Sequence, residues 1–338
     1  MKEKTLIVAE LSGNHNQNFQ VAKDTLRAIK KAGADAVKLQ TYTPDTITLN
    51  CDNKYFQIRQ GTIWDGTTLY KLYQKAYTPW DWQPKLKALA DKLGLMCFST
   101  PFDNTAVDFL EKMKVPLYKI ASFEINDIPL IEYAASRKKP MIISTGIAEE
   151  EDIKQALRAC RKVGNNDITL LKCTSEYPAS FSEVNLLTIP DMQRRFGVKV
   201  GVSDHTMGIA VPIAAVTLGA SVVEKHFILD KKLGGPDATF SLEPKEFAEM
   251  VKGIRDVEKA LGRVSYKLTP KLKKSREFGR SLFASADIKK GEKFTDKNIR
   301  SVRPAFGLPP KEIRKILGKI ALKDIAFGTP LRRSMVKR

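Results

Sequence analysis

Polar side chains stand at the ends of eight short apolar segments of this sequence, and several of them are of types that bind anions. A lysine supplies a positive charge, and the hydroxyl group of serine or threonine supplies a directional donor, so both suit a phosphate or a carboxylate ligand. The polar residues at the segment ends are Glu10, Lys38, Gln40, Thr100, Lys119, Ser122, Ser144, Lys172, Thr174, Ser175, Ser203, Asp204, His205, Glu224 and His226.

The three lysines of this set lie inside apolar segments and require anionic partners, because burying an unpaired charge is costly. The partners could be Glu10, Glu124 or Glu224 in a network of internal ion pairs, or they could be a bound anionic ligand. For a single lysine these two explanations weigh about equally. For three lysines and several hydroxyl groups at one end of a fold, a bound phosphate or carboxylate is the more economical explanation.

The sequence has only three histidines, His15, His205 and His226, and the last two follow the seventh and eighth apolar segments. If those segments are neighbouring strands, the two imidazoles converge. Imidazole together with oxygen ligands suits Mn²⁺, Fe²⁺, Zn²⁺ or Co²⁺ and leaves positions open for water and substrate. Asp237, in the loop GGPDATFSLEP, adds a carboxylate near the same place, although the loop also reads as a simple turn. No H-x-H or H-E-x-x-H pattern accompanies these residues.

The elements that position these residues alternate between short β-branched strands and amphipathic helices over about the first 260 residues, the pattern of repeated βα units. Gly33 is placed to end the first helix. Eight units of this length predict a (β/α)8 TIM barrel, whose active site lies at the carboxyl ends of the strands. An open doubly wound sheet is the alternative, but no G-x-G-x-x-G turn follows the first strand. The predicted strands are residues 5–10, 36–40, 95–100, 117–122, 141–146, 168–174, 199–204 and 221–227.

The pattern changes after the barrel, which we assign to residues 1–262. Residues 263–280 are polar and basic with one proline, as expected of a linker. Residues 281–338 predict a small α+β domain: two short strands around a Lys-Gly turn, a helical turn capped by Thr295 or Asp296, a short helix in PKEIRKILG, and a return to strand in IALKDIAFGTPLRR. Such a domain is marginal alone and would gain stability by docking on a partner.

The formal net charge of +19 raises nucleic acid as a possible partner. Much of the excess lies after Lys267, and aromatic residues are not interleaved with it as a stacking surface would require. We therefore favour a solvated basic surface over nucleic-acid binding. A non-catalytic protein that binds nucleic acid or anionic glycans remains an alternative function, which a steep salt dependence of binding would reveal.

The use of cysteine and the hydropathy of the sequence indicate that the protein resides in a reducing cytoplasm. The four cysteines are scattered without a C-x-x-C pair, so neither disulfides nor a thiolate zinc site is expected. The first residues lack the apolar stretch of a signal peptide, and no run approaches the roughly 18 apolar residues of a membrane span.

Several motifs together resemble the bacterial sialic acid synthase family over nearly the whole chain: AELSGNHN, KLQTYTPDTITLN, FSTPFD, YKIASFE, ISTGIA, LKCTSEYP, GVSDHTMG, EKHFILD and RSLFASADIKKGE…VRPAFGL. Within that family, YTPDTITLN, IRQGTIWDGTTLYKLYQKAYTPW and VRPAFGL are most similar to the pseudaminic acid synthases. The C-terminal domain resembles the family's antifreeze-like, or SAF, domain.

The resemblance implies a reaction and a cofactor. The reaction condenses phosphoenolpyruvate with the open-chain form of 2,4-diacetamido-2,4,6-trideoxy-L-altropyranose and water, giving a nine-carbon nonulosonic acid and inorganic phosphate. The cofactor is a divalent ion, usually Mn²⁺, with Mg²⁺ or Co²⁺ as alternatives. Synthesis of N-acetylneuraminic or legionaminic acid is the alternative within the family.

The resemblance also assigns roles to individual residues. Phosphoenolpyruvate would be held by Lys119, Ser122, Ser144 and Ser203, with Lys38, Gln40 and Thr100 beside it. The metal ligands would be His205 and His226, and His226 would also count among the catalytic residues. Glu10 and Asp237 would lie beside the reacting groups, Tyr177 belongs to the C-T-x-x-Y-P motif, and Arg303 would enter the barrel of a second subunit in a domain-swapped homodimer. Ser175 replaces the asparagine of the sialic acid synthases, which puts that substrate contact in doubt.

Overall fold

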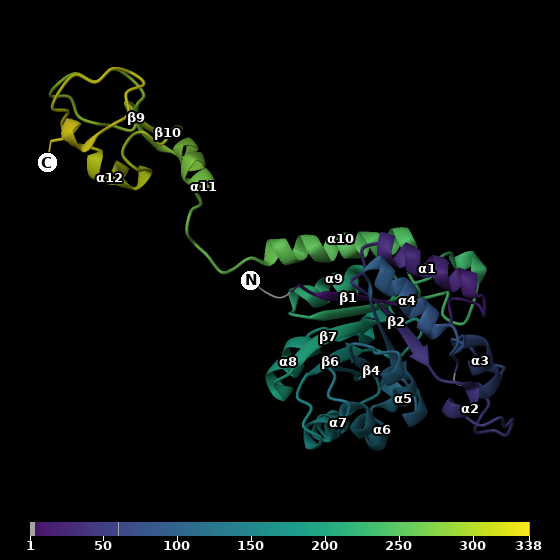
Figure 1. Ribbon diagram of the computed structural model, residues 1–338. Helices are drawn as coiled ribbons and strands as arrows, with labels where there is room; N and C mark the ends of the chain where they lie inside the picture. Colours follow the sequence, from purple (N-terminus) through teal and green to yellow (C-terminus); the bar gives the residue numbers. More distant parts are fainter. Residues whose placement is uncertain (1–3, 60, 338) are drawn as a thin grey trace. The chain divides into compact units, whose positions relative to one another are not determined.

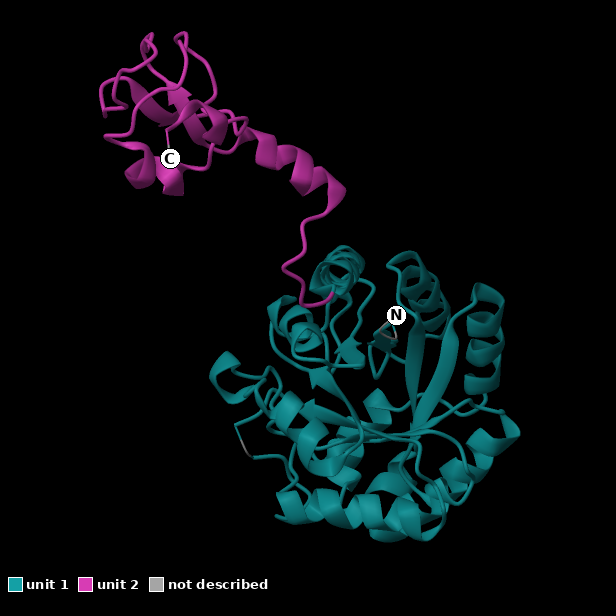
Figure 2. Cartoon of the chain, turned by 90° about the vertical axis from the view of Figure 1, so that its left-hand side faces the viewer, with its two compact units in different colours: residues 1–262 teal, residues 263–338 magenta. Residues whose placement is uncertain are grey.

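The computed structural model of the chain describes residues 4–59 and 61–337. Contacts divide the chain into two compact units, Met1–Gly262 and Arg263–Arg338 (Figure 2). Each unit is described by itself. No helix in the described part of the chain is both long enough and apolar enough to cross a membrane.

The first unit is a closed barrel of eight parallel strands in sequence order, surrounded by helices (Figure 1). The predicted TIM-barrel fold is confirmed, and each predicted strand is present. The strand β4 is shorter than expected because the chain enters a 3-10 turn at Ser122–Glu124. The strands are β1 (Leu6–Glu10), β2 (Ala36–Thr41), β3 (Met96–Pro101), β4 (Tyr118–Ile120), β5 (Met141–Ser144), β6 (Ile168–Cys173), β7 (Lys199–Asp204) and β8 (Val222–His226).

Helices follow each strand, and the first of them, α1, ends at the predicted glycine. The side chain of Asn18 caps α1 by accepting hydrogen bonds from two backbone amides, and Gly33 follows the helix with a φ of +89°, a conformation that favours glycine. The helices of this unit are α1 (Phe19–Lys31), α2 (Pro44–Ile47), α3 (Leu69–Ala76), α4 (Gln83–Leu93), α5 (Asn104–Lys112), α6 (Ile128–Ala135), α7 (Glu150–Lys162), α8 (Thr188–Phe196), α9 (Ala210–Thr217) and α10 (Pro244–Leu261).

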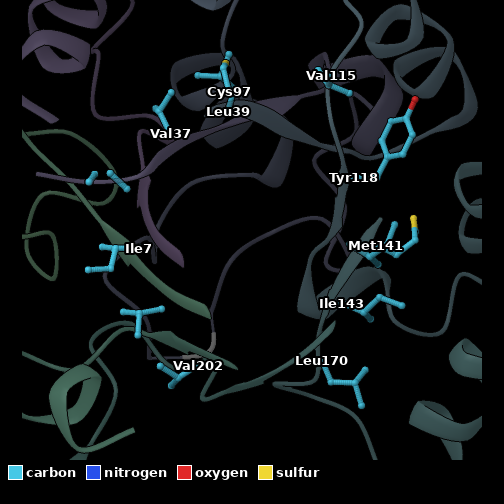
Figure 3. Packing of buried hydrophobic residues seen from close by; sticks show 14 of the residues in the cluster. Ile7, Val37, Leu39, Cys97, Val115, Tyr118, Met141, Ile143, Leu170 and Val202 are labelled. Carbon is cyan, nitrogen blue, oxygen red and sulfur yellow. The ribbon is translucent and has the colours of Figure 1, made fainter. Parts of the chain in front are cut away.

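Alternate residues of each strand serve two different cores. One set packs outward against the helices, as Ile7, Val37 and Leu170 do (Figure 3). The other set fills the inside of the barrel near the amino ends of the strands and consists of Val8, Ala36, Phe98, Leu117, Ile142, Leu171 and Val222. Because side chains alternate along a strand, the inward positions beyond this apolar layer are fixed by counting in twos.

A buried ion pair joins β7 to β8 on the outward face of the barrel. Lys225 Nζ lies 2.5 Å from Asp204 Oδ2 and also donates to the carbonyl of Thr206, and both side chains of the pair are almost fully buried. Burial is the main cause that lowers the pKa of Lys225, and Asp204 opposes it.

Replacing Lys225 by methionine is expected to lower the free energy of unfolding by about 3–5 kcal/mol, because Asp204 keeps a buried charge without its partner. Denaturant unfolding measures the effect. The double variant Lys225→Met with Asp204→Asn removes both charges and should recover most of the loss. Equal instability of the single and double variants would contradict this explanation.

The second unit is a small α+β fold built on its own core. Strands β9 (Ser281–Ala284) and β10 (Ile299–Val302) pair antiparallel, and the helices are α11 (Pro270–Ser275) and α12 (Ile313–Ile316). The stretch predicted as a linker thus contains the helix α11. The predicted return to strand appears only as isolated bridges, such as Ile288 with Ile325. The predicted helical turn is present, because the amides of Asn298 and Ile299 both donate to the carbonyl of Thr295. The core comprises Leu282, Ile288, Phe294, Ile299, Ile316, Leu331 and their neighbours.

Candidate active site

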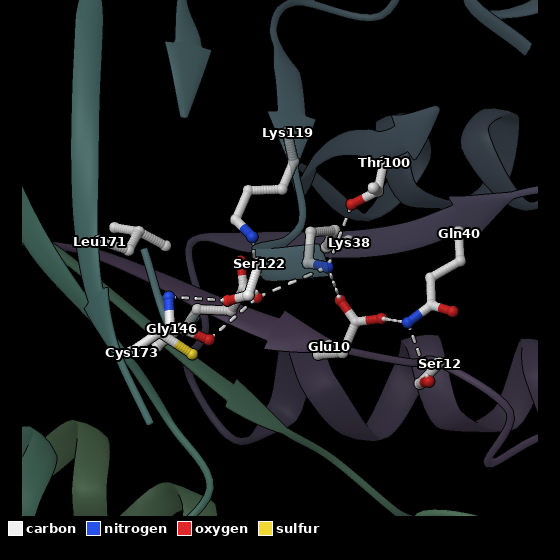
Figure 4. Close-up of polar contacts among 12 residues, drawn as sticks. Glu10, Ser12, Lys38, Gln40, Thr100, Lys119, Ser122, Gly146, Leu171 and Cys173 are labelled. Carbon is white, nitrogen blue, oxygen red and sulfur yellow. Dashed lines mark hydrogen bonds and ion pairs between the residues drawn. The ribbon is translucent and has the colours of Figure 1, made fainter. Parts of the chain in front are cut away.

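Four charged side chains, those of Glu10, Lys38, Lys119 and Glu224, meet inside the barrel. Figure 4 shows Glu10, Lys38 and Lys119 of this cluster. Lys38 Nζ lies 2.6 Å from Glu10 Oε2 and 3.5 Å from Glu224 Oε1. Lys119 Nζ lies 3.7 Å from the same oxygen of Glu224. All four residues are at most 4% exposed, so the charges interact in a poorly solvated environment. The internal pairing that the sequence left open is therefore present, with Glu10 and Glu224 as the partners.

Burial and pairing shift the pKa values of this cluster in opposite directions. Burial lowers the pKa of Lys119, although the charge of Glu224 opposes the shift. For Lys38 burial acts in the same sense, but Glu10 and Glu224 together raise its pKa above the ordinary value. Burial raises the pKa of Glu10, whereas the two lysines outweigh burial and lower the pKa of Glu224. The cluster thus holds a positively charged Lys38 against Glu224.

Hydroxyl groups surround this charged cluster. Thr100 Oγ1 accepts a hydrogen bond of 3.3 Å from Lys38, and Ser203 Oγ donates one of 3.4 Å to Glu224. Ser122 Oγ accepts from the backbone amide of Gly146 at 3.1 Å. Ser144 Oγ is buried and has no hydrogen-bond partner among the described residues. Two buried lysines and several hydroxyl groups therefore gather at this end of the barrel, a set of side chains that suits a small anion.

The two histidines predicted as metal ligands lie next to each other, with ring centroids 5.3 Å apart. His205 Nδ1 lies 2.9 Å from the carbonyl oxygen of Thr174, so this nitrogen carries a proton. Burial alone would lower the pKa of His205, but the charge of Cys173 and hydrogen bonds to Cys173 and Thr174 raise it, and Nε2 offers its lone pair when the ring is neutral. His226 Nδ1 is buried without a hydrogen bond, and it lies 3.7 Å from Asp237 Oδ2. Burial lowers the pKa of His226 well below its ordinary value, which keeps the imidazole neutral.

These residues fit a divalent ion that keeps several positions open. The described part of the chain holds no group of three or more His, Cys, Asp or Glu side chains arranged as a metal site. An ion bound here would have two imidazole ligands, with Asp237 nearby, and would take its remaining ligands from water and substrate. The unpaired, neutral nitrogen of His226 is the atom that such an ion would satisfy.

Gln40 and Asp237 connect the charged cluster to the histidines. Gln40 Nε2 donates to Glu10 Oε1 and to Ser12 Oγ, at 3.0 Å in each case. Burial raises the pKa of Asp237, while hydrogen bonds from the side chain of Ser12 and the backbone of Gly13 oppose the shift. The loop that follows β8 thus brings Asp237 to the site, as the sequence predicted.

A cavity of about 430 Å³ opens at this end of the barrel. Its lining combines polar residues with apolar ones, many of which come from the connection between β2 and β3. Its polar lining includes Ser12, Gln40, Glu124, Ser175, Tyr177, His226 and Asp237. The cavity is large enough for a sugar and is continuous with the residues predicted to carry out chemistry.

Two residues from the sequence analysis lie elsewhere. The prediction that Lys172 shares the inner cluster is wrong: it lies on the outward face of β6 with Leu170, is half-buried, and donates to the carbonyl of Cys173 at 3.0 Å. Cys173 takes the inward position instead. Arg303 belongs to the second unit, where its side chain is exposed.

Cys173 and Glu124 also belong to this site, although neither was predicted as a site residue. Cys173 Sγ lies 3.9 Å from His205 Nδ1, and counting in twos from Leu171 would have identified it. Glu124, considered only as a partner for the lysines, lines the cavity, and its Oε2 atom is buried without a hydrogen bond. Burial raises the pKa of Glu124 to about 7, although Lys119 opposes the shift. A carboxyl group with this pKa in a cavity suits proton transfer near neutral pH.

We expect Glu124 to accept a proton during turnover, so kcat should rise with pH as this group loses its proton near pH 7. Glu124→Gln should lower kcat by about 10²–10⁴-fold and remove that limb of the pH profile. The measurement is kcat from pH 5 to 9 for both proteins. An unchanged limb in the variant would assign the ionisation to another group.

Comparisons with known proteins show which families the two parts of the chain match. A model of the NeuB family matches residues 25–266, and a model of the SAF domain matches residues 279–337. The chain is 50% identical to the pseudaminic acid synthase of Helicobacter pylori, over 100% of this chain and 99% of that protein. It is 36% identical to the N,N'-diacetyllegionaminic acid synthase of Legionella pneumophila, over 96% of this chain and 92% of that protein.

A solved structure is also similar. The N-acetylneuraminic acid synthetase of Leptospira borgpetersenii, crystallised with citrate, aligns with a TM-score of 0.72 and 29% identity, over 82% of this chain and 91% of that chain.

Proposed function

Because the chain belongs to the NeuB family, as its motifs predicted, we propose that it is a pseudaminic acid synthase. It condenses phosphoenolpyruvate with the open-chain form of a 2,4-diacetamido-2,4,6-trideoxy hexose and water, and it releases inorganic phosphate. The observation that carries this function is the cluster of Lys38 and Lys119 with buried hydroxyl groups, which adjoins the histidine pair and a sugar-sized cavity. Family membership makes the chain an enzyme, which disfavours a purely surface-binding role.

The charged cluster binds phosphoenolpyruvate. Lys119 and Lys38 supply positive charge to its phosphate and carboxylate, and Ser122, Ser144 and Ser203 donate hydrogen bonds. Ser144 Oγ, buried and unpartnered, gains a partner when the anion binds. The same groups stabilise the phosphate as negative charge accumulates on it during departure.

The reaction forms one carbon–carbon bond, and at C2 it replaces the carbon–oxygen bond to phosphate with a carbon–oxygen bond to the oxygen of water. C3 of phosphoenolpyruvate attacks the aldehyde carbon of the sugar, the aldehyde oxygen takes up a proton, and positive charge develops at C2. Water adds at C2 and loses a proton, and the tetrahedral intermediate expels phosphate together with the bridging oxygen. Glu10, Asp237 and Glu124 are the carboxyl groups that can hold this water or accept its proton, and Gln40, Ser175 and Tyr177 position the sugar.

Synthases of the NeuB family are in general metalloenzymes. His205 and His226 would hold the divalent ion, which we propose to be Mn²⁺, with Mg²⁺ or Co²⁺ as alternatives. When bound, the ion polarises the aldehyde oxygen and makes the aldehyde carbon easier to attack.

A phosphate-release assay tests the proposed function. Purified protein is incubated with phosphoenolpyruvate, a panel of acetamido sugars, and Mn²⁺ or a chelator. Phosphate should appear only with an acetamido sugar, and fastest with the 2,4-diacetamido-2,4,6-trideoxy sugar. A preference for N-acetylmannosamine or for the legionaminic precursor would assign the chain to the alternative synthases, and no phosphate with any sugar would contradict the function.

We also propose that the chain acts as a domain-swapped homodimer in the cytoplasm. The barrel (residues 1–262), a connecting segment (263–280) and the SAF domain (281–338) would then be its functional parts. The exposed side chain of Arg303 would complete the sugar site of the other subunit. Sedimentation should give a dimer, and Arg303→Ala should raise KM for the sugar while leaving KM for phosphoenolpyruvate unchanged. A fully active monomer would contradict the swap.

A further inference from the structure

The connection between β2 and β3 contains more than the single helix of a usual βα unit, and several of its residues line the cavity. It contains α2, α3 and α4, and between α2 and α3 the chain folds back on itself. Gln57 forms an antiparallel bridge with Thr68, and the amide of Ile58 donates to the carbonyl of Thr67 at 2.9 Å. We refer to residues 57–59 and 61–68 as the fold-back segment.

Trp64 in the fold-back segment is held by two loops that carry functional residues. Its Nε1 atom donates to the carbonyl oxygen of Pro236 at 2.8 Å, and Pro236 precedes Asp237. Its ring lies 5.3 Å from the ring of Tyr177, which follows β6. The indole therefore has a fixed position in the cavity lining, beside Tyr177 and the loop that carries Asp237.

Six apolar side chains of the cavity lining form what we call the apolar wall: Ile47, Ile58, Trp64, Leu69, Leu72 and Phe102. The hydroxyl groups of Tyr42, Thr62 and Tyr73 also belong to residues of the cavity lining, and that of Thr62 already donates to Asp65. A sugar hydroxyl facing this wall would lose its water without gaining a partner, whereas a methyl group would make favourable contacts. The polar functional groups of the sugar must instead face Gln40, Ser175, Tyr177 and Asp237.

We propose that Trp64 is a specificity-determining residue, which selects a deoxy sugar by packing against the methyl group that replaces the 6-hydroxyl. This inference rests on the proposed function, and it adds which part of the site recognises the deoxy position. The hydroxylated sugar would bind less well, because its 6-hydroxyl group would be buried against apolar side chains that cannot form a hydrogen bond with it.

The test compares two matched sugars, the 2,4-diacetamido-2,4,6-trideoxy hexose and the 2,4-diacetamido-2,4-dideoxy hexose that keeps its 6-hydroxyl. The wild type should favour the deoxy sugar in kcat/KM by about tenfold or more. Trp64→Ala should bring the two values within about threefold, mainly by raising KM for the deoxy sugar, while KM for phosphoenolpyruvate is unchanged. Trp64→Phe keeps an apolar ring without the indole donor and should retain the preference.

Two further variants control the experiment. Tyr55→Ala alters an exposed residue near the fold-back segment that does not line the cavity, and it should leave the preference unchanged. If Trp64→Ala does not fold, Leu69→Ala, in the same wall, must reduce the preference. No preference in the wild type, or an equal loss for both sugars in the wall variants, overturns the inference. Absence of turnover with every sugar would instead contradict the proposed function.

Discussion

Replacement of Lys119 by methionine is expected to lower kcat/KM for phosphoenolpyruvate by about a hundredfold to a thousandfold. Methionine preserves most of the volume of the side chain but removes the positive charge that faces the departing phosphate. Glu224, which lies 3.7 Å from Lys119 Nζ, keeps Lys38 as its partner at 3.5 Å, so we expect the barrel to fold. Steady-state kinetics with varied phosphoenolpyruvate measures the loss.

Lys172→Met is the matched control for this prediction. Lys172 is also a strand lysine whose pKa is lowered by burial, but its side chain lies on the outward face of β6. This control should retain kcat/KM within about threefold, as expected for a residue outside the site. Similar losses in both variants would show that the inner cluster has no special role in binding the anion.

Removal of the metal ion should abolish turnover. Chelation followed by desalting should leave less than about 1% of the activity, and added Mn²⁺ should restore it, because the aldehyde is a poor electrophile without the ion. His226→Ala should lower kcat by at least about a hundredfold and should also weaken Mn²⁺ binding, which equilibrium dialysis measures without any substrate.

The third histidine provides the control. His15 is buried, its Nε2 atom lies 3.1 Å from Thr78 Oγ1, and burial lowers its pKa to about 4. His15→Gln should bind Mn²⁺ as the wild type does. Full activity after rigorous metal removal, or equal loss of Mn²⁺ binding in the two histidine variants, would contradict the assignment of His226.

The barrel could be predicted from the sequence because its strands are apolar on both faces and are separated by helices with clear end signals. The same apolar character concealed which face each strand residue takes. Lys172 was wrongly placed in the inner cluster for this reason, and Cys173 was overlooked. Counting in twos from the inward Leu171 separates them, but that count needs one residue whose direction is already known.

The cavity wall could not be predicted from the sequence, because it depends on where loops meet. Trp64 lies 172 residues before Pro236 in the sequence, yet the two are hydrogen-bonded. Burial raises the pKa of Glu124, and no local pattern in the sequence shows that this residue is buried. The residues on strand ends were found from the sequence because the barrel geometry gathers them at one end whatever the loops do.

The proposed condensation is tested most directly by mass spectrometry of the product formed from ¹³C-labelled phosphoenolpyruvate and the 2,4-diacetamido-2,4,6-trideoxy sugar. We expect a nine-carbon acid that contains all three labelled carbons, formed in equal amount to the released phosphate. Phosphate released together with labelled pyruvate, and no labelled nine-carbon acid, would contradict it.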